Sequence, residues 1–172
     1  MTTADDRRTV EAQIGRPVRS EIEVVSRCHL GVPVVVKVPP LLDDGTPFPT
    51  LYWLSCPLAV KRIGRLEGGG GVRRMEQKAA ADPLFRTRLE DAHSSYEEER
   101  DRLVPPAAIP RPSGGVGGAR TGVKCLHAHY AHTRAGGDNP VGELVAGWVE
   151  PLDCTVPCVV DGERNPEWEP RP

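Results

Sequence analysis

Proline and glycine interrupt this chain so often that long regular elements have little room. The 172 residues include 18 glycines and 18 prolines, together more than a fifth of the total. Proline fixes φ and lacks a backbone donor, and glycine weakens the interior of helices and strands, so both concentrate in turns. Much of the chain is therefore expected to be loop, with short elements between the breaks.

The segments between these breaks predict an α+β fold. Apolar, β-branched and aromatic residues predict strands at residues 22–28, 32–38 and 50–55, the first two joined as a hairpin. Apolar residues and helix-start signals predict helices at residues 4–14, 57–67, 72–81, 83–103, 125–135 and 141–149. We expect a single domain in which a small antiparallel sheet is packed by four or five helices.

We expect the domain to span residues 1–150, because a chain of this length with a hydrophobic fraction of 38% can bury one core. Residues 1–14 are expected to form a weakly anchored arm, since Val10 and Ile14 are the only apolar anchors of its helix. Residues 151–172 form a Pro-rich, acidic tail. With few apolar anchors, this tail is expected to be extended and dispensable for folding.

The loop at residues 39–49 is expected to be ordered in spite of its irregular sequence. Four of its residues are proline, and Gly45 supplies a turn. An ordered loop would pack Phe48 against the strand that carries Tyr52 and Trp53.

The charge balance argues against a polyanionic partner. Lys and Arg number 22 against 24 Asp and Glu, which gives a net charge of -2 and a pI of about 6.2. There is no basic field for nucleic acid or an anionic membrane, no apolar run near the ~20 residues of a membrane span, and no signal-peptide core. We expect a cytoplasmic protein whose five cysteines serve metal binding or catalysis rather than disulfides.

The segment from Cys125 to His132 concentrates side chains that bind metals. It holds three of the five histidines and one of the five cysteines. In a helix, Cys125, His129 and His132 would lie at i, i+4 and i+7 on one stripe, whereas His127 would point the other way. A thiol and imidazoles on one stripe suit zinc.

A single helix cannot complete a tetrahedral site, so the other ligands must come from elsewhere in the chain. Cys28 would end the first strand, and Cys56 would stand just before the helix at residues 57–67. We predict a metal site of Cys28, Cys56, Cys125 and His129, with His132 as second choice. Zinc is the expected ion, and an iron–sulfur cluster is the alternative if a larger pocket opens between the cysteines.

A second hypothesis is an enzyme with hydrolytic or thiol-dependent chemistry. At a helix N-terminus Cys56 would have a lowered thiol pKa, and a histidine could act as its base. The candidate catalytic residues are Cys56, His127 and Asp138, in a pocket that also holds His129. A metal closed by four protein ligands would instead indicate a structural site and an interaction module.

Cys154 and Cys158 form a C-x3-C pair in the tail. No second pair accompanies them at the spacing of a zinc ribbon, so we do not assign them a role.

Four strings resemble a bacterial family catalogued as domain of unknown function 501, over residues 14–148. They are RCHLGVP (27–33), DGTPFPTLYWLSCP (44–57), KCLHAHYAH (124–132) and AGGDNPVG (135–142). The family has no established activity. Its genes often neighbour those of a septum-formation initiator, an exopolyphosphatase-like phosphatase and enolase, an association that suggests a link to cell division without giving a mechanism. A protein partner is expected if the metal site is structural and the protein is an interaction module.

Overall fold

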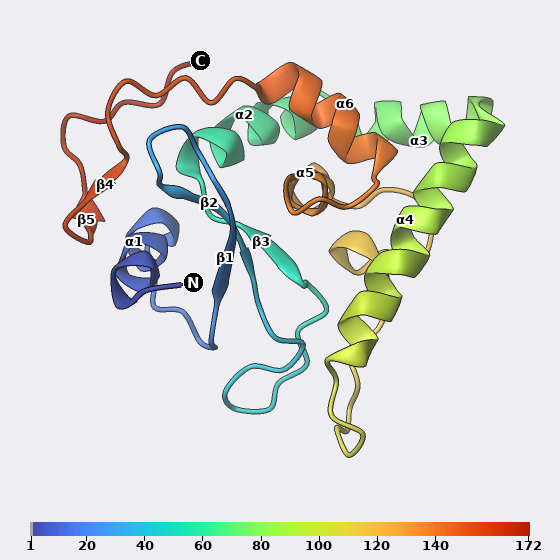
Figure 1. The fold of residues 1–172 in the computed structure, drawn as a ribbon. Coiled ribbons are helices and arrows are strands. Elements are labelled where there is room, and N and C mark those ends of the chain that lie inside the picture. Colours follow the sequence, from blue (N-terminus) through green and yellow to red (C-terminus); the bar gives the residue numbers. More distant parts are fainter. Residues whose placement is uncertain (1) are drawn as a thin grey trace.

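The fold is α+β, as the sequence predicts. The computed structural model describes residues 2–172, which form six α-helices, a short 3-10 helix and five strands (Figure 1). In chain order these are α1 (Ala4–Ile14), β1 (Glu23–Arg27), β2 (Pro33–Lys37), β3 (Tyr52–Leu54), α2 (Pro57–Gly68), α3 (Gly71–Ala81), α4 (Pro83–Arg102), η1 (Val116–Gly118), α5 (Leu126–Arg134), α6 (Pro140–Val149), β4 (Val159–Val160) and β5 (Glu163–Arg164). None of the described helices combines the length and apolar character that crossing a membrane requires.

β2 is the middle strand of the main sheet. It pairs antiparallel with β1 on one side and with β3 on the other. Across the β2–β3 ladder, Val35 faces Leu54 and Val36 faces Trp53. Neighbouring residues of a strand point to opposite faces, and accordingly Val35 and Leu54 join the main core while Val36 and Trp53 join a second apolar cluster. Both faces of this small sheet are therefore packed.

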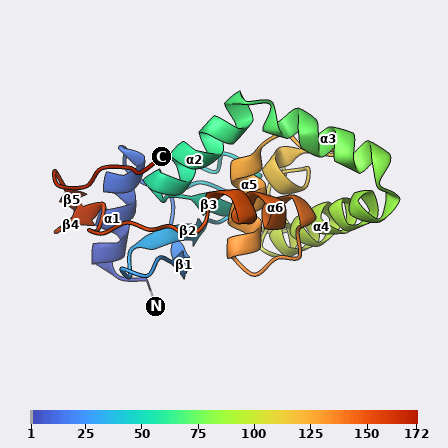
Figure 2. The same ribbon diagram turned by 90° about the horizontal axis from the view of Figure 1, so that it is seen from above.

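α1 covers the face of the sheet that carries Val36. Val10 is fully buried in the same cluster, and α1 lies alongside β1 and β2 in two perpendicular views (Figures 1 and 2). The carboxylate of Asp6 accepts two hydrogen bonds from Arg27 of β1, at 2.8 and 2.9 Å. These contacts hold α1, expected from the sequence to be a weakly anchored arm, against the sheet.

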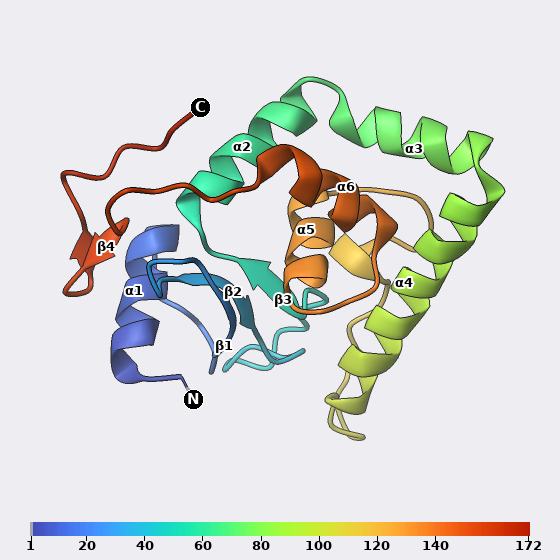
Figure 3. The same cartoon turned by 45° about the horizontal axis from the view of Figure 1, so that its top comes forward.

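The opposite face of the sheet packs against the helices. α5 lies at their centre, in contact with β3, α2, α6 and η1, and its residues Leu126, Tyr130 and Ala131 are fully buried. Figure 3 shows α2, α3 and α4 arranged as an angular frame around α5 and α6. The main core therefore lies between the sheet and α5.

The helices begin where the sequence places its breaks. Pro57, Pro83 and Pro140 open α2, α4 and α6, at a position where the missing N–H would have no helical partner anyway. Asp82 and Asn139 cap α4 and α6 with side-chain oxygens. Local chemistry therefore sets these boundaries before tertiary packing is considered.

The loop at residues 39–49 makes its expected contact. The ring centroid of Phe48 lies 5.6 Å from that of Trp53, and the Phe48 amide donates to the Pro40 carbonyl at 2.8 Å. The prediction that Phe48 packs against the third strand is confirmed.

The tail after α6 is extended, but it lies against the rest of the domain. It runs past α2 and reaches α1, where β4 and β5 pair as a small hairpin (Figure 1). Leu152, Cys158 and Val159 are buried. Arg62 of α2 donates to Asp153 at 2.7 Å, and Arg164 donates to two carbonyls at the end of α1, each at 3.0 Å. The tail therefore has more anchors than its sequence indicates.

The Asp6–Arg27 pair predicts a pH-dependent contribution to stability. Hydrogen bonding from Arg27 lowers the pKa of Asp6 from 3.8 to about 2, against the opposing effect of burial and with help from Thr3. A lowered carboxyl pKa stabilises the fold fully above about pH 4, and the stabilisation is lost as the pH falls toward 2. Asp6→Asn should reduce the free energy of unfolding by about 1–2 kcal/mol at pH 7 and by about half as much near pH 3. Urea unfolding at both pH values measures this. Asp5→Asn, on the exposed side of the same turn, is the control; equal losses for the two variants would contradict the prediction.

Removing residues 151–172 should destabilise the domain, contrary to the expectation from the sequence. The truncation exposes the surface that Leu152, Cys158 and Val159 cover. We expect the melting temperature to fall on the order of 10 °C, because several kilocalories of apolar burial are lost. Thermal unfolding followed by circular dichroism measures the shift. A change below about 2 °C would mean that the tail contacts contribute little.

Candidate metal centre

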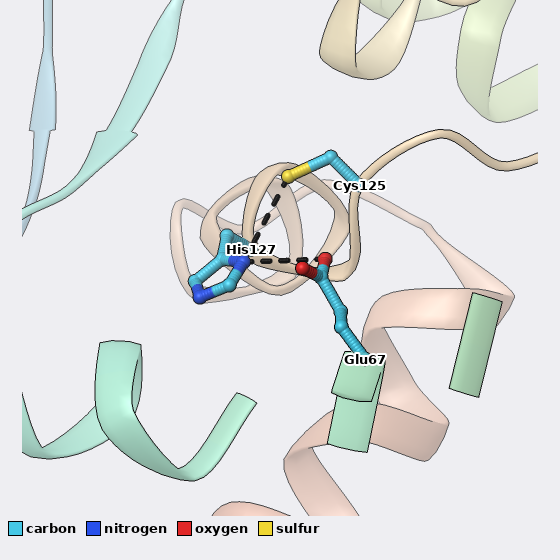
Figure 4. Close-up of side chains that lie close together, drawn as sticks. All are labelled: Glu67, Cys125 and His127. Carbon is cyan, nitrogen blue, oxygen red and sulfur yellow. Dashed lines mark hydrogen bonds and ion pairs between the residues drawn. The ribbon is translucent and has the colours of Figure 1, made fainter. Parts of the chain in front are cut away.

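Glu67, Cys125 and His127 bring three potential metal ligands to one point (Figure 4). Glu67 lies near the end of α2, Cys125 immediately precedes α5, and His127 lies in the first turn of α5. One ligand atom from each residue lies within 4.8 Å of the other two. Among the described residues, this is the group of His, Cys, Asp and Glu side chains that meets that spacing.

The histidine ring is held at both of its nitrogens. Nδ1 of His127 lies 3.2 Å from Oε1 of Glu67 and 3.9 Å from Sγ of Cys125. Its Nε2 donates to the Val60 carbonyl at 3.1 Å. Because a carbonyl can only accept, Nε2 carries a proton. Nδ1 lies within ion-pair distance of the Glu67 carboxylate, so a ring protonated at both nitrogens forms a charged pair there.

Electrostatics agree with this protonation state. Burial alone would lower the pKa of His127, but hydrogen bonding to Cys125 and to the Val60 carbonyl, with the nearby charge of Glu67, raises it to about 9. A metal ion at Nδ1 would take the place of one proton and leave the Nε2–H bond to Val60 intact.

Glu67 also fixes the start of α5. Its Oε1 accepts the backbone N–H of Leu126 at 2.7 Å, whereas the N-cap residue Cys125 makes no side-chain capping bond. The acidic side chain therefore supplies the cap that the thiol does not. Cys125 keeps its sulfur free for another contact.

The site borders an open pocket of about 380 Å³. Cys125 and His127 form part of its wall, and most of the remainder is apolar, including Trp53 and Leu54 of β3 and Val60 of α2. A group held by the three ligand side chains could therefore be reached from this pocket.

The structure changes which histidine accompanies Cys125. The predicted stripe of Cys125, His129 and His132 requires Cys125 to be helical, but its φ of -148° and ψ of 115° are extended. The side chain of Cys125 therefore does not follow the helical spacing. It meets His127, which the helical projection placed on the opposite face.

The predicted ligands Cys28, Cys56, Cys125 and His129 do not come together. Cys28 and Cys56 line a separate cavity with the tail, and His129 is enclosed in the core. Cys56 does precede α2, but the expected lowering of its pKa is wrong. Burial raises the pKa of its thiol to about 11, and the amides at the start of α2 offset only part of that effect.

His129 and His132 belong to a buried hydrogen-bond network instead. Oδ1 of Asn139 accepts the amides that open α6, so its Nδ2 donates to Nδ1 of His129 at 2.9 Å and of His132 at 3.2 Å. Burial lowers the pKa of His129 to about 3 and that of His132 to about 4. Both rings are therefore neutral and structural. The Nε2 of His129 finds no hydrogen-bond partner among the described residues; its ring lies edge-to-face with that of His93, 5.6 Å between centroids.

The predicted catalytic pocket is likewise divided. Asp138 is exposed and pairs with Arg88 of α4 at 2.6 Å, Cys56 lies in the tail cavity, and His127 faces Glu67. The structure therefore gives these residues three different surroundings.

Glu67 is the candidate ligand that the sequence did not predict. A negative charge in the last turn of a helix interacts unfavourably with the helix dipole. That unfavourable position is the one local signal in the sequence that Glu67 has a role outside its own helix. Its distance in sequence from the Cys/His segment hides the contact.

Comparison with known proteins adds a family. A family model described as "Protein of unknown function (DUF501)" matches residues 24–147. No curated protein and no solved structure matches the chain. The resemblance noted in the sequence is thereby confirmed.

The buried network predicts that Asn139 matters more for stability than its neighbour. Asn139→Ala removes the α6 cap and leaves two buried imidazoles without a donor, so we expect a loss of about 2–4 kcal/mol in the free energy of unfolding. Asp138→Ala removes only an exposed ion pair and should cost less than about 1 kcal/mol. Urea unfolding of the two variants tests this, and similar losses for both would contradict it.

Proposed function

The chain belongs to the DUF501 family of proteins of unknown function, and from its own residues we propose that it is a zinc-binding protein. The proposed ligands are Glu67, Cys125 and His127. A sulfur, a ring nitrogen and a carboxylate oxygen are the donors that zinc takes in proteins. This set replaces the ligands predicted from the sequence alone.

The observation that supports a metal site is that Cys125 and Glu67 both face Nδ1 of His127. In a Cys–His–acid catalytic triad, the nucleophile and the acid face opposite nitrogens of the ring. Here the opposite nitrogen, Nε2, is occupied by the Val60 carbonyl. Three donors that converge on one point, with the ring oriented from behind by a carbonyl, are typical of a metal site.

Three protein ligands leave one position of a tetrahedral zinc ion for another molecule. That position would face the pocket that Cys125 and His127 border. The pocket has an apolar wall, and Val60 at its edge is 40% exposed. We therefore propose an interaction module in which a donor group from a protein partner completes the coordination. The gene neighbours of the family make a cell-division protein the first partner to test.

Hydrolysis by zinc-bound water is the second candidate function. The observation that favours it is the open pocket beside the ligands, since a catalytic zinc site keeps one position for water. Zinc-dependent cleavage of p-nitrophenyl acetate, lost in variants of the three ligands, would support this candidate over the interaction module.

Zinc binding at this site is tested by substitution of each ligand. Glu67→Gln, Cys125→Ser and His127→Gln should each weaken zinc binding by at least about tenfold, because each removes one donor. Glu67→Gln keeps an acceptor for the Leu126 amide, so the fold should persist. Isothermal titration with Zn²⁺ and metal analysis of the purified protein measure the effect.

The matched control is Glu90→Gln, an exposed carboxylate on α4. It should leave zinc affinity unchanged. Full retention of zinc affinity in all three ligand variants, with circular dichroism showing intact folds, would refute the proposed site.

A further inference from the structure

Four of the five cysteines line one cavity that lies away from the Glu67–Cys125–His127 site. Cys28 follows β1, Cys56 precedes α2, and Cys154 and Cys158 come from the tail. The tail passes the β1–β2 turn and the start of α2 (Figure 1), and the four cysteines lie in the wall of one cavity. The rest of the wall is mostly apolar, with Leu152 as one example. All four cysteines are free thiols.

Hydrogen-bond donors point at two of these sulfurs. The indole N–H of Trp168 donates to Sγ of Cys154 at 3.4 Å, and the amide of Gln13 donates to Sγ of Cys158 at 3.6 Å. N–H donors of this kind stabilise thiolates and tune metal–thiolate centres.

Gln13 is a second, independent sign of a ligand. Its side chain lines the same cavity and is only 4% exposed. Its Nε2 is satisfied by the Pro33 carbonyl at 2.8 Å, whereas its Oε1 has no hydrogen-bond partner among the described residues. An unpaired buried oxygen is rare in folded proteins and often marks the place of a water or a bound group.

The spacing of the sulfurs bears on the kind of metal. No three of them lie within 4.8 Å of one another in residues 2–172. Four thiolates on one zinc ion, with bonds of about 2.3 Å, would lie about 3.8 Å apart. An iron–sulfur cluster distributes its thiolates over several iron atoms and so holds them farther apart.

We propose that Cys28, Cys56, Cys154 and Cys158 form a second, all-thiolate site for a soft metal centre, with an iron–sulfur cluster favoured over a single zinc ion by the spacing. A metal ion takes the place of the thiol protons, so the four sulfurs would bind it as thiolates. Binding is a ligand exchange without electron transfer. Each thiol releases its proton to water, and its sulfur forms one bond to a metal atom. The bond between that metal atom and a thiolate of the molecule that delivers it breaks at the same time.

This site assigns a role to the tail. Cys154 and Cys158 supply half of the proposed ligands. Asp153, which lies between α6 and Cys154, accepts a hydrogen bond from Arg62 of α2. The tail therefore carries proposed ligands across α1 and α2, and metal binding would attach it more firmly to the domain.

Anaerobic purification of the full chain tests the proposal. We expect iron and acid-labile sulfide, about four of each per chain, with a broad absorbance near 400 nm that is lost in Cys154→Ser and in the pair Cys154→Ser with Cys158→Ser. One zinc ion lost in the same variants would support the four-thiolate site with a single ion in it. Cys125→Ser is the matched thiol control and should retain this metal.

A measurement on the unaltered protein covers variants that fail to fold. Iodoacetamide labelling followed by mass spectrometry should leave all four cysteines unlabelled in the metal-loaded protein and label the partly exposed Cys28 and Cys154 after chelation. If reconstitution with equal amounts of ferrous and ferric iron and sulfide, or with Zn²⁺, changes neither labelling nor metal content at these cysteines, the inference is overturned. Zinc binding that depends on Cys125 would survive that result, so the two proposals fail separately.

Discussion

One hydrogen bond from α2 caps the first turn of α5, the central helix of this domain. The Glu67 carboxylate accepts the Leu126 amide, and α5, which starts there, contacts β3, α2, α6 and η1. A capping bond of this kind contributes about 1 kcal/mol, yet its position matters more than its size. Cys125 is extended as the N-cap residue, and because the capping carboxylate comes from α2, its sulfur makes no capping bond and lies 3.9 Å from Nδ1 of His127. The same bond therefore orders the core helix and assembles the candidate metal centre.

Asn139 plays the corresponding role at the other end of α5. One side-chain oxygen caps α6, and one amide group donates to two imidazoles. Leaving a buried ring nitrogen without a partner costs about 1–3 kcal/mol, and Asn139 supplies a donor for one nitrogen each of His129 and His132. This explains why a segment rich in histidines contributes a single imidazole, that of His127, to the candidate centre. The imidazoles of His129 and His132 are instead hydrogen-bonded within the core.

The sequence predicts the elements of this protein better than its sites. Pro57, Pro83 and Pro140 each begin a helix by local chemistry, and the alternation of Val35 and Val36 sets the two faces of the sheet, so the fold class and most boundaries follow from the residues. The ligands depend on what neighbouring elements supply. A regular helical projection puts Cys125 beside His129, but one extended residue at the N-cap breaks that register. Glu67 and the tail cysteines approach from distant parts of the chain, and no spacing in the sequence encodes those approaches.

α2 separates two thiol environments of different chemistry. Cys56 precedes its first turn and shares a cavity with three other cysteines. Glu67 lies in its last turn, with a ring nitrogen and one sulfur nearby. At about 1.5 Å per residue, the 12 residues of α2 span about 18 Å, roughly twice the ~8–10 Å over which salt screens exposed charges. The charge of a metal at one end is therefore weakly felt at the other. Mixed nitrogen, oxygen and sulfur donors suit zinc, whereas four sulfurs suit softer centres. A single rigid helix can thus keep two proposed centres apart, so that donor chemistry rather than competition between the sites selects the metal at each end.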